Sequence, residues 1–513
     1  MRRIAMVRKF CIVILTVLCF CLIQPATNHS FFPENLVKII SPQPRQEFTS
    51  HPVEILVKLH RRAKKETFRA YLNGRSITEK FEQVPGTKYQ LRALVGPEDG
   101  LRVTLEGRIR TNRLWTSVRG PLGTLDIDYR KFYVIEDSEE VFSLLRSVSI
   151  DGGEGGDDQP RGIVVDESGH VYVAGYITAG GQRDIWLAKY DANLNYIDGI
   201  TRPGPANGDD EGYTMALDNA GHLYVIGYMS IAGQGHDIWL AKFDTSLNFI
   251  KEITVNGTDS DDDEGYGIMY DEDGEYLFVA GYVRDTGQNG NIWIGKYDTD
   301  LNQEALTIRN YPANDTDKAR FLAIDNSGNL FVSGSISQAT TDYDLWIGKF
   351  DKATLAFIDE EILVGPTTEE DKGYGMIVDG TDIYITGTIT ESGQGFNIWL
   401  AKYDTDLNQL DSMTINGPLN GEDVAYTMIM DDSGRLYHTG VYSEVNGGAN
   451  IWIAQFNKNL DLLASTTING SADGYDTGLG IVRGLGQDFY VTGAIDETVG
   501  GFNIWIGHYQ ILQ

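Results

Sequence analysis

The chain has 513 residues, of which 42% are hydrophobic and 11% aromatic, so it has ample material for a core but is too long for one ordinary domain. Its 58 glycines and 9 methionines indicate many tight turns rather than long helices. The formal net charge of −31 is unevenly spread: residues 31–120 hold 17 basic and 9 acidic residues, whereas residues 137–513 hold 19 and 61. This change of sign predicts a domain boundary near residue 130 and argues against nucleic acid as a partner of the acidic part.

The first 26 residues have the pattern of an export signal. Four basic residues precede an apolar run from Phe10 to Ile23, which is too short to span a bilayer comfortably. We therefore expect a signal peptide over residues 1–26 and no transmembrane helix after its removal, with an uncleaved anchor as the alternative. All three cysteines lie inside this segment, so the mature chain would have no disulfide and no thiolate metal site. The expected location is the periplasm, the cell surface or the medium.

Residues 31–136 have the pattern of a β-sandwich. Alternating runs such as VEILVKL (53–59), YQLRALV (89–95) and LRVTLEG (101–107) are separated by turn residues. About 100 residues of this kind predict an immunoglobulin-like (Ig-like) domain. They resemble bacterial Ig-like modules, although no cysteine pair sharpens the resemblance. Two smaller all-β pieces are the alternative.

The octapeptide DIWLAKYD at 184–191 occurs seven times with small changes, and its tryptophans lie 53 or 54 residues apart. A period of this size indicates a repeat protein. Each repeat contains four runs with strand character, and the third run is apolar on both faces, so each sheet needs neighbouring sheets to cover it. The sequence thus predicts an all-β, seven-bladed β-propeller with four-stranded blades over residues 143–513. The expected packing tryptophans are Trp186, Trp239, Trp293, Trp346, Trp399, Trp452 and Trp505.

The ends of the repeat array predict a closed ring. The seventh repeat ends soon after its tryptophan run, and the missing fourth run is found upstream, where SVSIDG (147–152) parallels SMTING (412–417). An N-terminal strand that completes the last blade would leave no open sheet edge. Runs such as LYVIGY (223–228), together with the octapeptide, resemble the SBBP-type β-propeller repeats of exported bacterial proteins. That resemblance implies a scaffold rather than a reaction.

Carboxylates recur in the loop before the first run of each repeat, eight residues before the aspartate that ends that run. We call them the loop aspartates, and they are Asp158, Asp210, Asp263, Asp317, Asp371 and Asp423, with Asp476 beside Tyr475 in the seventh repeat. Further acids flank them, among them Asp209, Glu211, Asp262, Glu264, Glu370 and Glu422. On one face of a propeller these oxygens would attract a ligand or Ca²⁺, with Asp209, Asp262, Glu370 and Glu422 as the candidate calcium ligands. The alternative is that each loop aspartate accepts backbone N–H groups of a turn.

Three other patterns give expectations. Arg320 departs from the pattern of the fourth repeat and is a candidate ligand-binding residue. The octapeptide lysines, such as Lys189, are expected to form ion pairs with the aspartates that end the first runs, such as Asp166; the seventh repeat has Arg483 at the latter position. A glycine in every second run, such as Gly281, predicts a close backbone approach between neighbouring blades.

No catalytic residue is identified, because no Ser-His-Asp order, zinc signature or phosphate-binding glycine loop is visible. We expect a non-enzymatic binding or cell-surface scaffold protein, whose acidic propeller face meets a protein or glycan of the cell envelope, with or without divalent cations. The charge asymmetry also predicts self-association through the basic N-terminal domain. The alternative is a propeller enzyme that cleaves polysaccharide, as a lyase or hydrolase, through carboxylates at the channel mouth.

Overall fold

The computed structural model describes residues 37–41, 47–48, 53–59, 64–73, 75–84, 87, 90–95, 112–119, 125–134 and 142–511, apart from 154, 288, 312, 314, 339–340, 420, 445–447, 473 and 498–500. The predicted signal peptide lies outside these residues. The chain forms two compact units, one of Met1–Thr104 with Arg110–Glu136 and one of Asp137–Gln513 with Leu105–Ile109. Each is described here by itself.

The first unit contains two sheets that share one core. The first sheet has the order β1 (Val37–Ser41), β3 (Val53–Leu59), β7 (Gln90–Val95) and β6 (Glu82–Gln83). The second has the order β2 (Glu47–Phe48), β9 (Leu125–Val134), β8 (Asn112–Arg119), β4 (Lys64–Leu72) and β5 (Arg75–Ser76). Alternate residues of the facing strands, such as Ile55, Val57, Ala70 and Leu72, are buried together. A short 3₁₀ turn, η1 (Thr78–Lys80), is the one helical element in the described part.

The described residues of the second unit form seven antiparallel sheets of four strands each. The innermost strands are β11 (Gln159–Val165), β15 (Glu211–Leu217), β19 (Glu264–Asp271), β23 (Lys318–Ile324), β27 (Lys372–Asp379), β31 (Val424–Met430) and β35 (Thr477–Arg483). The second strands are β12 (Val171–Ala179), β16 (His222–Ile231), β20 (Tyr276–Arg284), β24 (Asn329–Gln338), β28 (Asp382–Glu391), β32 (Leu436–Glu444) and β36 (Asp488–Glu497). The third strands are β13 (Gln182–Tyr190), β17 (Gly235–Asp244), β21 (Gly290–Asp298), β25 (Thr341–Asp351), β29 (Gly395–Asp404), β33 (Gly448–Phe456) and β37 (Gly501–Ile511). The outermost strands are β14 (Tyr196–Arg202), β18 (Phe249–Val255), β22 (Gln303–Arg309), β26 (Phe357–Leu363), β30 (Gln409–Ile415), β34 (Leu462–Ile468) and β10 (Phe142–Ile150).

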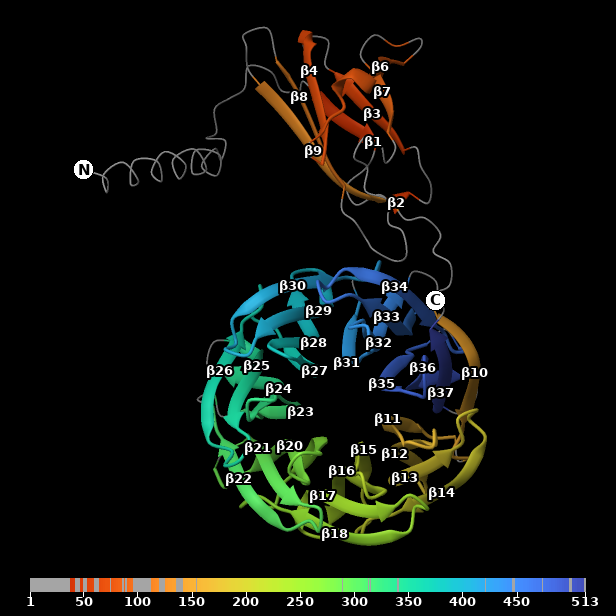
Figure 1. Ribbon diagram of the computed structural model, residues 1–513, viewed down its shortest axis with the longest axis vertical. Helices are drawn as coiled ribbons and strands as arrows, with labels where there is room; N and C mark the ends of the chain where they lie inside the picture. The colour runs from red at the N-terminus through yellow and green to blue at the C-terminus, as the bar shows by residue number, and fades with distance from the viewer. Residues whose placement is uncertain are drawn as a thin grey trace, which may run out of the picture. The chain divides into compact units, whose positions relative to one another are not determined.

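These sheets stand around a common axis and face one another, as in a β-propeller (Figure 1). The apolar core is divided among the spaces between consecutive sheets, since each cluster of buried side chains draws on two neighbours. Trp239 of β17, for example, packs against Tyr172 and Leu187 of the preceding sheet. All seven octapeptide tryptophans are buried in this way, with at most 7% of their surface exposed. The third strand can be apolar on both faces because a neighbouring sheet covers each of them.

The first and last sheets also pack together and complete the ring. Trp186 shares a core cluster with Tyr490 and Ile506. Strand β10 pairs with β37, with Ser149 opposite Trp505 and Ile150 opposite Ile504, which is the pairing expected from the sequence. The last sheet thus takes its fourth strand from the N-terminal side of the array, so none of the seven sheets has only three strands.

The strand-two glycines occupy a position that is crowded from within their own sheet and from the neighbouring one. A Cβ atom on Gly281 would lie 2.1 Å from the carbonyl oxygen of Glu264, which belongs to the first strand of the same sheet. Gly227 meets the Glu211 carbonyl oxygen in the same way. The expected approach between neighbouring sheets is present as well: a Cβ atom on Gly373 would lie 3.0 Å from the carbonyl oxygen of Gly334 in the preceding sheet, and one on Gly478 would lie 3.1 Å from the backbone nitrogen of Gly440. The register irregularity of the innermost strand pushes its carbonyl toward the second strand and leaves no room for a side chain.

Candidate functional site

Every innermost strand changes register once against the second strand, in the form of a β-bulge. Bulges leave a residue out of the ladder, and they often redirect its side chain at functional sites. We call the residues at these positions the channel ring, and they are Arg161, Tyr213, Tyr266, Arg320, Tyr374, Tyr426 and Leu479. All seven line one cavity on the propeller axis.

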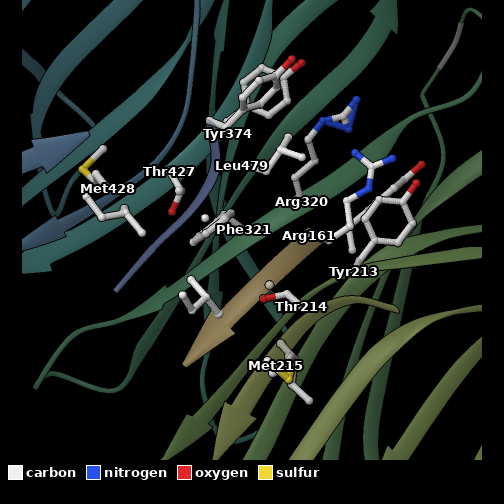
Figure 2. A pocket seen from close by; sticks show the side chains of 17 residues that line it. Arg161, Tyr213, Thr214, Met215, Arg320, Phe321, Tyr374, Thr427, Met428 and Leu479 are labelled. Atoms are coloured by element: carbon white, nitrogen blue, oxygen red, sulfur yellow. The ribbon is translucent and has the colours of Figure 1, made fainter. Parts of the chain in front are cut away.

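The cavity has a volume of about 500 Å³ and takes its lining from all seven innermost strands. In the view of Figure 2, Arg161, Arg320, Tyr213 and Tyr374 lie toward one side, and Met215 and Met428 lie away from them. No aspartate or glutamate is among the lining residues. In a chain of net charge −31, the cavity is thus lined by cationic, phenolic and apolar groups and by the hydroxyls of Thr214 and Thr427.

Arg320 is the most unusual member of the channel ring. Its guanidinium lies 5.4 Å from the ring centres of both Tyr266 and Tyr374, which come from the two neighbouring strands. Each of these tyrosines makes an edge-to-face contact with a further tyrosine, Tyr213 at 4.9 Å and Tyr426 at 5.0 Å. The Nε atom of Arg320 is buried without a hydrogen-bond partner, and no carboxylate of the described residues forms an ion pair with this side chain. The contacts that the described residues give this charge are therefore with aromatic faces and not with a paired carboxylate.

Arg161, on the other side of the ring, is paired. Its guanidinium contacts the carboxylate of Glu211 at 3.3 Å, and Arg183 contacts the same carboxylate at 2.5 Å. Glu211 is 1% exposed, so these two cations share one buried anion. The phenol rings of Tyr213 and Tyr176 lie 5.2 and 5.8 Å from the Arg161 guanidinium.

A hydrogen-bonded group adjoins Arg320. The hydroxyl of Tyr266 donates to Glu264 at 2.6 Å and accepts from the ammonium of Lys318 at 3.1 Å. Burial, followed by the charge of Arg320, lowers the pKa of Lys318 to about 8, while Glu264 opposes that shift. Lys318 therefore changes charge within the range in which proteins are commonly studied.

The loop aspartates lie elsewhere, inside their own loops. The carboxylate of Asp371 accepts the N–H of Gly365 at 2.7 Å and of Thr390 at 2.8 Å, and the Asp371 N–H donates to the carbonyl of Tyr343 on the preceding sheet. The carboxylates of Asp158, Asp210, Asp263, Asp317, Asp423 and Asp476 make the same two kinds of backbone contact, and all seven side chains are 0–1% exposed. Each loop aspartate thus ties a loop, its own second strand and the neighbouring sheet together.

Burial is the largest influence on the acidity of these groups. It raises the pKa of Asp371 to about 6, although the two backbone N–H bonds lower it. The same cause raises the pKa of Asp210, Asp263 and Asp317 to about 6.

The flanking acids are also engaged. Glu370 pairs with Lys372, and Glu422 accepts the hydroxyl of Tyr475. Asp209 and Asp262 accept the backbone N–H groups of Arg183 and His236, each at 3.0 Å. Within the described ranges, no three His, Cys, Asp or Glu side chains are grouped so that they could hold a metal ion. A calcium role for these carboxylates stays a prediction.

The seventh repeat differs by one residue from the expected alignment. Asp476, and not Tyr475, makes the loop contacts. The turn position that Asp166 occupies in the first repeat belongs to Gly484, because both N–H groups donate to the carbonyl four residues later. Arg483 instead pairs with Asp432 through two contacts of 2.8 Å. The turn residue here is a glycine and not an aspartate, so the sequence alignment of this repeat was placed one residue too early.

The expected ion pairs between octapeptide lysines and turn aspartates are wrong. The ammonium of Lys189 donates to the carbonyl of Thr245 at 2.8 Å, in the turn between the third and fourth strands of the next sheet. Lys242 bonds Thr299 in the same way. Asp166 meanwhile caps its own turn and accepts the hydroxyl of Tyr172. Lys242 also lies 3.8 Å from Asp300, in the same turn as Thr299, whereas Lys402 pairs at 2.6 Å with Asp382 of its own sheet.

Of the residues nominated from the sequence for binding, Arg320 lines the cavity, and the carboxylates do not. Sequence reasoning missed the rest of the channel ring. A signal was present: in all seven repeats the ring residue lies five positions before the residue that occupies the turn position.

Among the described residues, no helix has the length and apolar character needed to cross a bilayer.

Comparisons with known proteins give one family match and several distant structural likenesses. The model of a family described as SBBP, a beta-propeller repeat, matches residues 152–181. No curated protein matches the chain. Solved structures that resemble it include a protein of unknown function from Dyadobacter fermentans, with 10% identity and a TM-score of 0.45 over 73% of this chain and 100% of that one. Two others, each with 10% identity, are quinohemoprotein alcohol dehydrogenase from Comamonas testosteroni (TM-score 0.40; 72% and 77% covered) and Sqt1 from Chaetomium thermophilum bound to the N-terminus of ribosomal protein L10 (TM-score 0.43; 71% and 98% covered). Likenesses this distant carry no argument about function. The repeat match and the recurring four-stranded sheets make the chain a β-propeller repeat protein.

Proposed function

We propose that this protein is an exported, non-enzymatic binding protein that takes an anionic group of its ligand at the arginine and tyrosine end of the propeller channel. In this proposal the second unit is a seven-bladed propeller, and the first is an Ig-like module that holds it at the cell envelope. The partner carries a carboxylate or a similar anion and is a molecule of the envelope or its surroundings.

The observation that carries the proposal is the guanidinium of Arg320. A partly buried charge without an acidic partner is costly, and proteins normally pair such groups. Arginine presents a rigid fork of donors that matches a carboxylate, and it is the residue most often used for such recognition. The channel supplies walls of tyrosine around this fork but no anion, so a ligand that brings one would complete the site.

A binding role is favoured over polysaccharide cleavage by channel-mouth carboxylates. Glycoside hydrolysis of that kind needs two carboxyl groups at a suitable separation. The lining residues include none, and Glu211 and Glu264, which contact lining residues, are engaged by arginine and by tyrosine hydroxyls.

The proposal is tested by calorimetric titration of the full chain with acetate, benzoate and phosphate, and by analysis of the recovered ligand. We expect at least one anion to bind, the variant Arg320→Gln to weaken it about tenfold or more, since a hydrogen bond to a charged group is worth about 1.5–3 kcal/mol, and the ligand to be recovered unchanged. The control Arg146→Gln alters an exposed arginine of β10 and should bind as the unaltered protein does. Equal binding by Arg320→Gln, or chemical conversion of the ligand, would overturn the proposal.

A further inference from the structure

The cavity beneath the channel ring has a chemistry of its own. Away from the polar end lie Met215, Phe321 and Met428, each contributed by a different innermost strand, with Thr214 and Thr427 beside the methionines. Figure 2 shows Phe321 between the arginines and Met428, so the apolar surface begins directly beside the charged groups. The cavity is thus amphipathic, with the cation at one end and mainly thioether and hydrocarbon groups, together with two threonine hydroxyls, at the other.

The charges of the site favour a ligand with one anionic group. Arg161 already shares Glu211 with Arg183, so Arg320 is the one lining cation without a carboxylate among the described residues. The net charge of −31 creates a negative electrostatic potential around the chain, and this potential repels a polyanion over long distances. A single anionic group that reaches Arg320 inside the cavity pairs locally and is less affected.

The apolar surface distinguishes between monoanions. A sugar acid has more hydroxyl groups than Thr214 and Thr427 can bond. Those that press against Phe321 and the methionines would lose hydrogen bonds to water without replacement. A hydrocarbon or aryl body would instead displace water from that surface favourably. The volume of about 500 Å³ lies within the range of about 300–1,000 Å³ of small-molecule sites.

Resting on the proposed function, we infer that the ligand is a small organic acid with one carboxylate and an apolar aryl or alkyl body. The carboxylate pairs with Arg320 between Tyr266 and Tyr374, and the body lies over Phe321 and the two methionines. Methionine adapts to irregular shapes, so the site accepts a class of acids rather than a single compound.

The test compares four ligands on the unaltered full chain by isothermal titration: 4-phenylbutyrate, its neutral amide 4-phenylbutanamide, acetate and glucuronate. We expect 4-phenylbutyrate to bind at least about tenfold more tightly than each of the others, because one lacks the charge, one lacks the body and one has a polar body. If glucuronate or acetate binds as tightly, the apolar ligand class is overturned while anion binding stands. If the amide binds as tightly, pairing with Arg320 is overturned. If none of the four binds, both this inference and the proposed function fail.

Two variants locate the contacts. Arg320→Gln should weaken 4-phenylbutyrate and acetate by similar factors, whereas Phe321→Gln should weaken 4-phenylbutyrate about fivefold or more and leave acetate unchanged. Equal effects of Phe321→Gln on both acids would overturn the placement of the apolar body. If Phe321→Gln does not fold, the same comparison is made with Leu479→Gln, whose side chain lines the cavity from a bulge and so lies outside the strand ladder.

Discussion

The loop aspartates set two effects against each other, and Asp371→Asn measures which is stronger. Burial disfavours the charged carboxylate, whereas the bonds from Gly365 and Thr390 favour it. Burial dominates and raises the pKa from 3.8 to about 6. A folded-state pKa above the unfolded one means that the folded protein holds the proton between these values, so its stability falls as the pH rises through that window.

The magnitude follows from linkage. With pKa values of about 6 folded and 3.8 unfolded, the contribution of Asp371 to the free energy of unfolding falls by about 1.4 kcal/mol between pH 5 and pH 8. Asparagine does not titrate, so this fall is absent in Asp371→Asn. The variant loses one acceptor for a backbone N–H and is destabilised at both pH values, but the loss relative to the unaltered protein should be about 1.4 kcal/mol smaller at pH 8 than at pH 5.

Urea unfolding followed by tryptophan fluorescence at pH 5 and pH 8 provides the measurement, because the octapeptide tryptophans are buried. Glu369→Gln is the matched control, since Glu369 is exposed and lies two residues away in the same loop. Its effect on the free energy of unfolding should be small, because the side chain is exposed. If Asp371→Asn costs the same at both pH values, or more at pH 8, the hydrogen bonds outweigh burial and the reasoning is refuted.

Three further predictions concern other parts of the propeller. Gly281→Ala should lower the melting temperature severely or prevent folding, because its Cβ would meet a backbone carbonyl at 2.1 Å; an unchanged melting temperature would contradict this contact. Since the pKa of Lys318 is lowered to about 8, the affinity for 4-phenylbutyrate should fall as the pH rises past 8, and Lys318→Met should abolish that dependence in titrations at pH 7 and pH 9. Removal of divalent cations with EDTA should leave the melting temperature unchanged, because the carboxylates of the loop aspartates already accept backbone N–H groups; a fall reversed by Ca²⁺ would instead support the cation role of Asp209 and Asp262.

The sequence predicted the propeller well because the repeat and its alternation are properties of the strands themselves. The tryptophan spacing indicated recurring sheets, and SVSIDG indicated where the missing strand would come from. The sequence also offered the role of the loop aspartates as acceptors of backbone N–H groups. A residue that recurs in every repeat is better explained by a turn than by a single site.

The channel was not predictable in the same way. A bulge breaks the two-residue alternation, so the pattern could not tell which side chain of an innermost strand faces the axis. Lys189 shows a second limit: its partner is the carbonyl of Thr245, and a backbone acceptor leaves no trace in the identities of side chains. Arg320 was identified because it differs from the residue that other repeats have at this position. Tyr266 and Tyr374 match the repeat pattern, so nothing in the sequence distinguished them.

Because the channel ring lies at the bulges, the residues that line the channel can vary while the strand pairing of the seven sheets stays the same. A side chain placed outside the ladder can be exchanged without shifting the pairing of the strands on either side. Seven such places meet on one axis, and here they carry two guanidinium groups, four phenols and one isobutyl group. A paralogous chain with the same tryptophan spacing could therefore recognise a quite different molecule after a few substitutions. The residues five positions before each turn would indicate the chemistry of that molecule.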